Sequence, residues 1–166
     1  MITEVWGDAI KMLQNGEIKV LVHYCNCFCT MGGGIAFGIA KTFPEAALAD
    51  KKTKHGDINK LGTILPVKII RGNIIEDNIK EVIVVNSYTQ FTPGKDVSYA
   101  AIELCLIKIN QDFEGKKITM PMIGAGIAGG DFLIIRQMIK NILVDVDVTI
   151  IYWDGDKEKF NNEFPK

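Results

Sequence analysis

Residues 18–34 read IKVLVHYCNCFCTMGGG and decide how this sequence folds. The first part, 18–24, is almost continuously apolar, which is typical of a central strand in a parallel sheet. Three glycines at 32–34 then open a predicted helix over 34–43. A second buried run, 118–123, leads in the same way into the glycine-rich turn 124–130 and a helix that begins near Asp131. The sequence therefore predicts two strand, glycine turn and helix units.

Apolar strands alternate with helical patterns along the whole chain, which predicts one α/β domain spanning 1–166. Further strands are predicted at 2–6, 62–70, 81–86 and 148–153, with the middle two forming a hairpin. Pro44 fits the first turn of a helix over 45–54, because that position needs no amide hydrogen. A covering helix over 97–113 is expected to be capped by Asp96. Residues 154–166 are charged and predict a tail or a short helix.

Composition excludes several classes of protein. A chain of 166 residues with 48% hydrophobic residues can bury a full core, so disorder is excluded. The net charge of −1 gives no general attraction for nucleic acid or for an acidic membrane. The uncharged stretch 118–130 is too short to span a bilayer, and the amino terminus does not resemble a signal peptide. We therefore expect a cytoplasmic monomer without a membrane partner.

The cysteines and acidic residues do not form a metal-binding pattern. Cys25, Cys27 and Cys29 alternate and Cys105 stands alone, a spacing that fits neither a zinc site nor a disulfide framework. We expect reduced, buried or half-buried thiols. No metal site and no cofactor are predicted.

Both glycine turns are candidate anion sites. Glycines allow a ligand to approach the backbone, and the amides at the start of the following helix carry partial positive charge. Either turn alone is explained as well by a tight connection, but two in one small sheet favour a diphosphate held between them. The second turn also fits the dinucleotide fingerprint GxGxxG. Only 37 residues follow Gly129, too few for the rest of a dinucleotide-binding domain.

The segment VHYCNCFCTMGGGIA at 22–36, followed by Phe43 and Pro44, resembles the signature of the macrodomain family. WGDAI at 6–10 is similar to the family's first-strand motif, and PMIGAGIAG at 121–129 to its second phosphate loop. The resemblance implies a mixed, mostly parallel six-stranded sheet sandwiched between helices. It also implies that the ligand is ADP-ribose or a derivative.

The resemblance implies which residues would bind each part of ADP-ribose. Asp8 and the Ala9 backbone would hold adenine, and Tyr152 or Trp153 would supply an apolar platform for the base. The residues that would wrap the diphosphate are Gly32, Gly33, Gly34, Ile35, Gly124, Ala125, Gly126, Ile127, Ala128 and Gly129. Asp8 is explained alternatively as a helix cap, and the two aromatic residues as core packing.

Three residues are candidates for catalysis. Asn26 suits the diol of the distal ribose, since its amide both donates and accepts; the alternative is an asparagine that structures the loop. His23 could transfer a proton near neutral pH, or be a hydrogen-bonded core histidine. Asp131 could activate water, or cap the helix that begins there.

The stretch from His23 to Cys27 resembles the branch that includes the ADP-ribose-1″-phosphate phosphatases. A related branch removes ADP-ribose from glutamate with a Lys and Asp pair, but here Ser87 and Ala128 stand near those positions. We therefore predict hydrolysis of ADP-ribose-1″-phosphate. The alternatives are a non-enzymatic reader or sponge of ADP-ribose, and a hydrolase that strips ADP-ribose from protein or nucleic acid. Nucleic acid is expected as a partner only in that ADP-ribosylated form.

Overall fold

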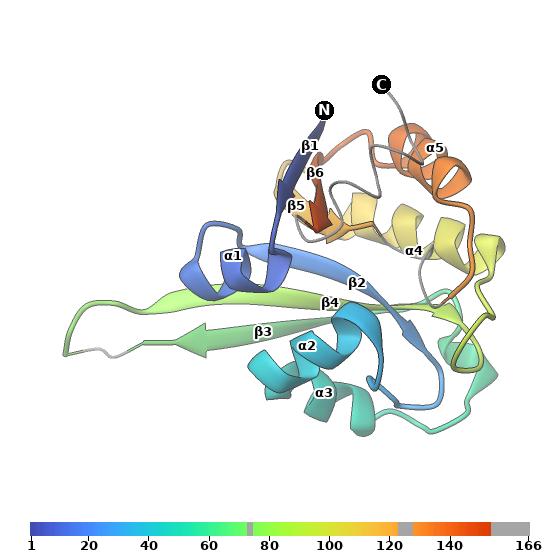
Figure 1. Cartoon of the computed structure of the whole chain (residues 1–166), viewed down its shortest axis with the longest axis horizontal. Coiled ribbons are helices and arrows are strands. Elements are labelled where there is room, and N and C mark those ends of the chain that lie inside the picture. The colour runs from blue at the N-terminus through green and yellow to red at the C-terminus, as the bar shows by residue number, and fades with distance from the viewer. Residues whose placement is uncertain (73–74, 123–127, 154–166) are drawn as a thin grey trace.

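The computed structural model describes residues 1–72, 75–122 and 128–153, and its centre is one six-stranded sheet (Figure 1). The strands lie in the order β1-β6-β5-β2-β4-β3, and every neighbouring pair is parallel except β3 and β4. Their bounds are β1 Ile2–Gly7, β2 Val20–Asn26, β3 Ile64–Arg71, β4 Lys80–Gln90, β5 Lys117–Pro121 and β6 Asp147–Trp153. The predicted mixed sheet and its antiparallel hairpin are confirmed.

Helices cover both faces of this sheet (Figure 1). One face carries α1 (Ala9–Asn15), α2 (Gly34–Thr42) and α3 (Pro44–Lys51), and the other carries α4 (Tyr99–Asp112) and α5 (Phe132–Ile142). A 3₁₀ turn, η1 (Ile58–Lys60), follows α3. The predicted arrangement of a sheet between helices is therefore confirmed.

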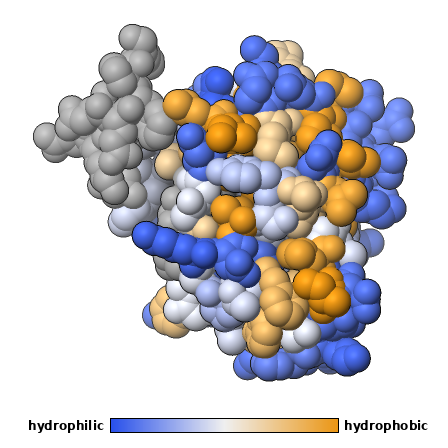
Figure 2. Space-filling view, turned by 90° about the vertical axis from the view of Figure 1, so that its right-hand side faces the viewer, coloured by the Kyte–Doolittle hydropathy of each residue, from blue (hydrophilic) through white to orange (hydrophobic). Residues whose placement is uncertain are grey.

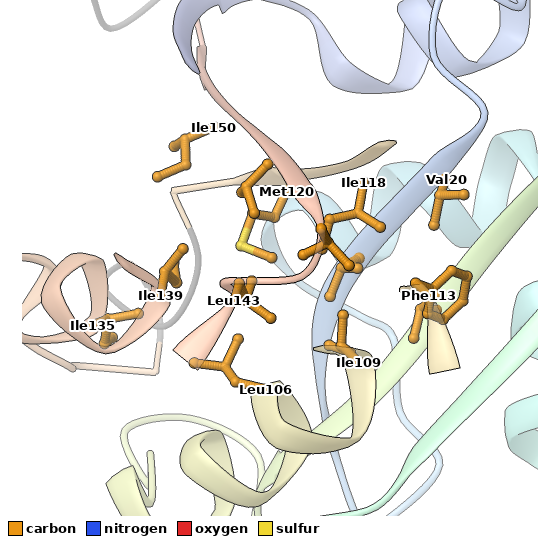
Figure 3. Packing of buried hydrophobic residues seen from close by; sticks show 14 of the residues in the cluster. Val20, Leu106, Ile109, Phe113, Ile118, Met120, Ile135, Ile139, Leu143 and Ile150 are labelled. Carbon is orange, nitrogen blue, oxygen red and sulfur yellow. The ribbon is translucent and has the colours of Figure 1, made fainter. Parts of the chain in front are cut away.

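Side chains of β2 point alternately into two cores, as the period of a strand requires. Val20 and Val22 pack with α4 and α5, whereas Leu21 packs with the helices of the opposite face. Figure 3 shows the larger core, in which α4 and α5 meet β5 and β6. Its fully buried members include Leu106, Ile109, Ile118, Met120, Ile135 and Ile139. This double burial explains why 18–24 is apolar on both faces.

Short polar residues begin most of the helices. Asp131 accepts a hydrogen bond from the Leu133 amide and caps α5, and Pro44 occupies the first turn of α3 as predicted. Asp96 is not the cap of α4: Ser98 accepts from the Ala101 amide instead. The prediction was wrong because the helix begins later than its apolar pattern, and Asp96 binds Thr92 within the preceding loop.

The cysteines are free thiols, as predicted: Cys25, Cys27 and Cys105 are buried and Cys29 is half-buried. Within the three described segments, none of the helices has the length and apolar character needed to cross a membrane. The charged segment 154–166 lies outside the described residues.

Leu106 and Leu133 form a matched test of this core, because both are helical leucines but one is fully buried and the other is 59% exposed. Leu106→Ala should lower the free energy of unfolding by about 2–5 kcal/mol, since it leaves a cavity in the larger core. Leu133→Ala should change it by about 0.5 kcal/mol or less. Urea denaturation of the two variants measures the difference. Equal losses would contradict the assignment of Leu106 to the core.

Candidate functional site

The carboxyl ends of five parallel strands meet at one edge of the sheet. Gly7 pairs with Trp153 at the ends of β1 and β6, and Asn26 pairs with Gln90 at the ends of β2 and β4. Ligands of open α/β sheets bind outside this edge. Figure 2 looks onto the end of the molecule where β2 and β4 end, and hydrophilic and hydrophobic groups are interleaved there.

The first glycine turn presents open backbone at this edge. Gly32, Gly33 and Gly34 are all exposed, and a β-carbon on Gly32 would meet nothing within 4 Å. Gly34 has a φ of +56°, a left-handed conformation that favours glycine, whereas Gly33 is extended. No side chain caps α2, so its first amides are available to an anion. Ile35 follows, half-buried against the core of this face.

Asn26 organises the loop between β2 and the glycines. Its amide nitrogen donates to the carbonyl and the hydroxyl of Thr30, at 3.0 and 2.8 Å. Its carbonyl oxygen accepts from the Phe28 amide at 2.9 Å. Both hydrogens of the side-chain amide are therefore used within the loop. This agrees with the alternative that Asn26 structures the loop. Contact with a ribose remains a prediction.

A buried polar cluster supports the same loop from below. The Lys60 ammonium, only 8% exposed, lies 2.8 Å from the Thr53 hydroxyl and 3.4 Å from the Cys29 sulfur. Beside them the Tyr88 hydroxyl donates to Asp50 at 2.7 Å, and burial raises the pKa of Asp50 while that hydrogen bond opposes the shift. Sequence reasoning missed these residues, because tertiary contacts alone bring the end of α3, η1 and β4 together.

The second glycine turn is described only at its end. Gly124, Ala125, Gly126 and Ile127 lie outside the described residues, so their predicted contacts with a diphosphate stay predictions. The Ala128 carbonyl accepts a hydrogen bond from the Val97 amide, and Gly129 has a left-handed φ of +77°.

Asp131, two residues beyond Gly129, is exposed. Its amide donates to the Tyr99 hydroxyl at 2.9 Å, and its carboxylate caps α5. The predicted cap is confirmed, and a second role as base remains a prediction.

His23 lies inside the core on the side of α3. It is fully buried, its Nε2 lies 2.6 Å from the side-chain oxygen of Asn86, and Asn86 donates in turn to the Ala46 carbonyl. Burial lowers the pKa of His23 from 6.5 to about 4, although the Asn86 hydrogen bond opposes this shift. This environment fits the alternative of a hydrogen-bonded core histidine, and it shields the imidazole from solvent.

The aromatic residues at the end of β6 have different surroundings. Tyr152 is 6% exposed, packs against Trp6 and Phe132, and donates its hydroxyl to Glu4 at 2.6 Å. Core packing therefore describes Tyr152 better than a platform for adenine. Trp153 is 60% exposed and remains the candidate platform.

Asp8 and Ala9 begin α1, a helix that the sequence analysis did not predict. The Asp8 carboxylate accepts a hydrogen bond from the Lys11 amide at 3.1 Å, so Asp8 caps the helix, as its alternative explanation expected. Ala9 is buried. Contact of either residue with adenine stays a prediction. Ser87, near the position of the lysine in the glutamate-specific branch, is fully buried. Among the described residues, no cluster of histidine, cysteine or acidic side chains could hold a metal ion.

Comparison with known proteins agrees with this architecture. Residues 22–139 match the model of the Macro domain family. The chain belongs to that family. This macrodomain is 33% identical, over 93% of its length and 97% of the relative, to an uncharacterized 17.5 kDa protein from the tk-vs intergenic region of enterobacteria phage T4.

Several relatives of this macrodomain carry functional names. It is 26% identical over 90% of its length to a DNA ADP-ribosyl glycohydrolase of Mycobacterium tuberculosis, of which it spans 42%. It is also 27% identical to an ADP-ribose 1″-phosphate phosphatase of Candida albicans. That match covers 78% of this chain and 85% of the relative. A solved structure of Thermosipho africanus DarTG in complex with ADP-ribose has a TM-score of 0.68 at 17% identity, covering 90% of this chain and 40% of that one. The relatives thus include named hydrolases of ADP-ribose compounds.

His23→Asn tests the buried imidazole through the pH dependence of stability. Folding keeps His23 neutral. Its stabilising contribution to the free energy of unfolding is therefore fully present above pH 6.5 and is lost as the pH falls toward 4. The wild type should lose about 3 kcal/mol of unfolding free energy over this range that the asparagine variant keeps. Urea denaturation at several pH values measures both. Parallel pH profiles would show that His23 titrates normally in the folded protein.

Proposed function

We propose that this macrodomain binds ADP-ribose along the carboxyl edge of its sheet and hydrolyses the phosphate monoester of ADP-ribose-1″-phosphate. The observation that supports this most is the first glycine turn, whose exposed backbone leads into the uncapped amino end of α2. Such an end offers several amide donors to a diphosphate and favours negative charge. Relatedness to the Candida albicans phosphatase supports the choice of reaction.

The ligand would lie across the strands in a defined direction. Adenine would sit between Asp8 and Trp153, which follow β1 and end β6 at one side of the edge. The diphosphate would lie over the glycine turns after β2 and β5. The distal ribose would then reach the Asn26 loop, whose hydrogen bonds hold it in one shape before the ligand arrives.

In the proposed reaction water attacks the phosphorus atom, and the bond between phosphorus and the ribose oxygen breaks. We assign the base to Asp131, because its carboxylate is exposed beside the second glycine turn whereas His23 is sealed in the core. Asp131 would take a proton from the attacking water, and the departing ribose oxygen would gain a proton from solvent, so that ADP-ribose and inorganic phosphate are the products. Backbone amides of the glycine turns would stabilise the charge that develops on the phosphate oxygens.

Removal of ADP-ribose from DNA is the second candidate, favoured by the relative from Mycobacterium tuberculosis. Ser87 and Ala128 stand where the glutamate-specific branch has a lysine and an aspartate, so a mechanism through a lysine adduct is not proposed here. Parallel assays on ADP-ribose-1″-phosphate and on an ADP-ribosylated oligonucleotide separate the two activities. If the protein binds both substrates but releases neither phosphate nor ADP-ribose from them, it acts as a non-enzymatic reader of ADP-ribose.

Gly33→Val tests whether the first turn holds the diphosphate. Gly33 has φ −142° and ψ 159°, an extended conformation that valine adopts without strain. The variant should therefore stay folded but lose ADP-ribose affinity by about tenfold or more, because the side chain occupies the space of the ligand. Isothermal titration calorimetry measures the affinity, and thermal unfolding without ligand is the control. In the wild type ADP-ribose should raise Tm more than AMP does. Unchanged affinity in Gly33→Val would show that the glycine serves only the turn.

Asp131→Asn tests the proposed base without removing the helix cap, because asparagine caps helices as well as aspartate does. Phosphate release from ADP-ribose-1″-phosphate should fall by about a hundredfold or more, while ADP-ribose affinity and thermal stability stay close to those of the wild type. A phosphate-release assay measures the rate. Full activity in this variant would exclude Asp131 as the base.

A further inference from the structure

The loop between β4 and α4 hydrogen-bonds to the segment that leads into the first glycine turn and to the end of the second turn. At its start, the Phe91 carbonyl accepts a hydrogen bond at 3.0 Å from the amide of Cys27, the residue after Asn26. At its end, the Val97 amide donates at 3.3 Å to the Ala128 carbonyl of the second turn. Residues 91–97 are therefore fixed to both sides of the proposed binding edge.

Internal hydrogen bonds give this loop one shape. The Gln90 side chain donates to the carbonyls of Thr92 and Gly94, both at 2.8 Å. The Asp96 carboxylate accepts from the amide and the hydroxyl of Thr92, also at 2.8 Å. A side chain carried by this loop is thus presented from a preorganised support, which lowers the entropy lost when it binds a ligand.

Lys95 is the cation that this loop presents. Its side chain is exposed, and its stem lies against Gly129, because a β-carbon on Gly129 would come within 3.1 Å of the Lys95 Cγ. No acidic side chain in the described segments pairs with Lys95. The adjacent Asp96 is bound to Thr92. Among the described residues the Lys95 ammonium therefore has no acidic partner, and its stem lies beside the end of the second glycine turn.

The strand order gives the position of Lys95 along the ligand. β1 and β6, which carry the proposed adenine site, lie at one side of the sheet, and β4 lies beyond β5 and β2. Lys95 follows β4 and its stem packs against Gly129 after β5, so it lies on the part of the edge formed by β5, β2 and β4, which β6 separates from Asp8 after β1. The group attached to the distal ribose would lie there.

We propose that Lys95 binds the phosphate attached to the distal ribose and so determines specificity for ADP-ribose derivatives that carry one. This inference rests on the proposed binding of ADP-ribose along the sheet edge. A lysine ammonium and a phosphate form a charge-assisted hydrogen bond. Free ADP-ribose lacks that phosphate, so it gains nothing from this contact.

Lys95→Met tests this inference, because methionine keeps an unbranched apolar stem against Gly129 and removes the charge. The KM for ADP-ribose-1″-phosphate should rise about fivefold, the size expected of one exposed ion pair, while kcat changes little. The Kd for ADP-ribose should stay unchanged. The difference in KM should shrink at 1 M salt, where the Debye length is about 3 Å. Lys95→Arg should retain the affinity, and Lys117→Met, an exposed lysine at the start of β5, is the matched control.

Binding measurements keep this test separate from the test of catalysis. If the wild type binds both ligands but releases no phosphate, calorimetry gives the two Kd values, and the same fivefold selectivity is expected. Equal weakening of both ligands by Lys95→Met would overturn the inference, since the ammonium would then contact the shared diphosphate. No effect on either ligand would also overturn it. A wild type that binds neither ligand would reject the proposed function itself and this inference with it.

Discussion

The pairing of β2 between β5 and β4 is the constraint on which the rest of this structure depends. All three strands are parallel, so their carboxyl ends and the loops that follow them lie at one edge of the sheet. Both faces of β2 are covered by helices, and this burial fixes its register. A slip of one residue would turn Leu21 and His23 toward the wrong core and would displace the Asn26 loop.

Buried polar groups transmit this constraint to the site. His23 and Asn86 link neighbouring strands and reach the Ala46 carbonyl of α3. Lys60 and Thr53 hold Cys29 at the bottom of the loop that ends in the glycines. Buried polar atoms are costly unless they are hydrogen-bonded, so these pairs specify one arrangement of strand, helix and loop. These contacts preorganise the described part of the edge at which the ligand is proposed to bind.

The proposed functions share one binding edge of the sheet and differ at the distal end of the ligand. Adenine, diphosphate and ribose are common to a reader, a phosphatase and an ADP-ribosyl hydrolase. What is attached to the ribose distinguishes them, and in the proposed binding mode the loop of residues 91–97 would border that position. An exposed lysine contributes little to overall affinity, but it would separate ligands that differ by one phosphate. Selectivity would thus come from a loop outside both glycine turns.

The sequence by itself determined the sheet, the hairpin, the helices from α2 to α5 and the first glycine turn, because strand periodicity and turn residues are local signals. It also placed Asn26, Asp131 and Trp153 at strand or helix ends. Only the tertiary structure decided that His23 and Tyr152 lie in the core, since burial depends on which elements pack against a side chain. It alone brought Lys60 beneath Cys29 and Lys95 against Gly129. These pairs are far apart in the chain, and no local pattern encodes contacts made across a sheet edge.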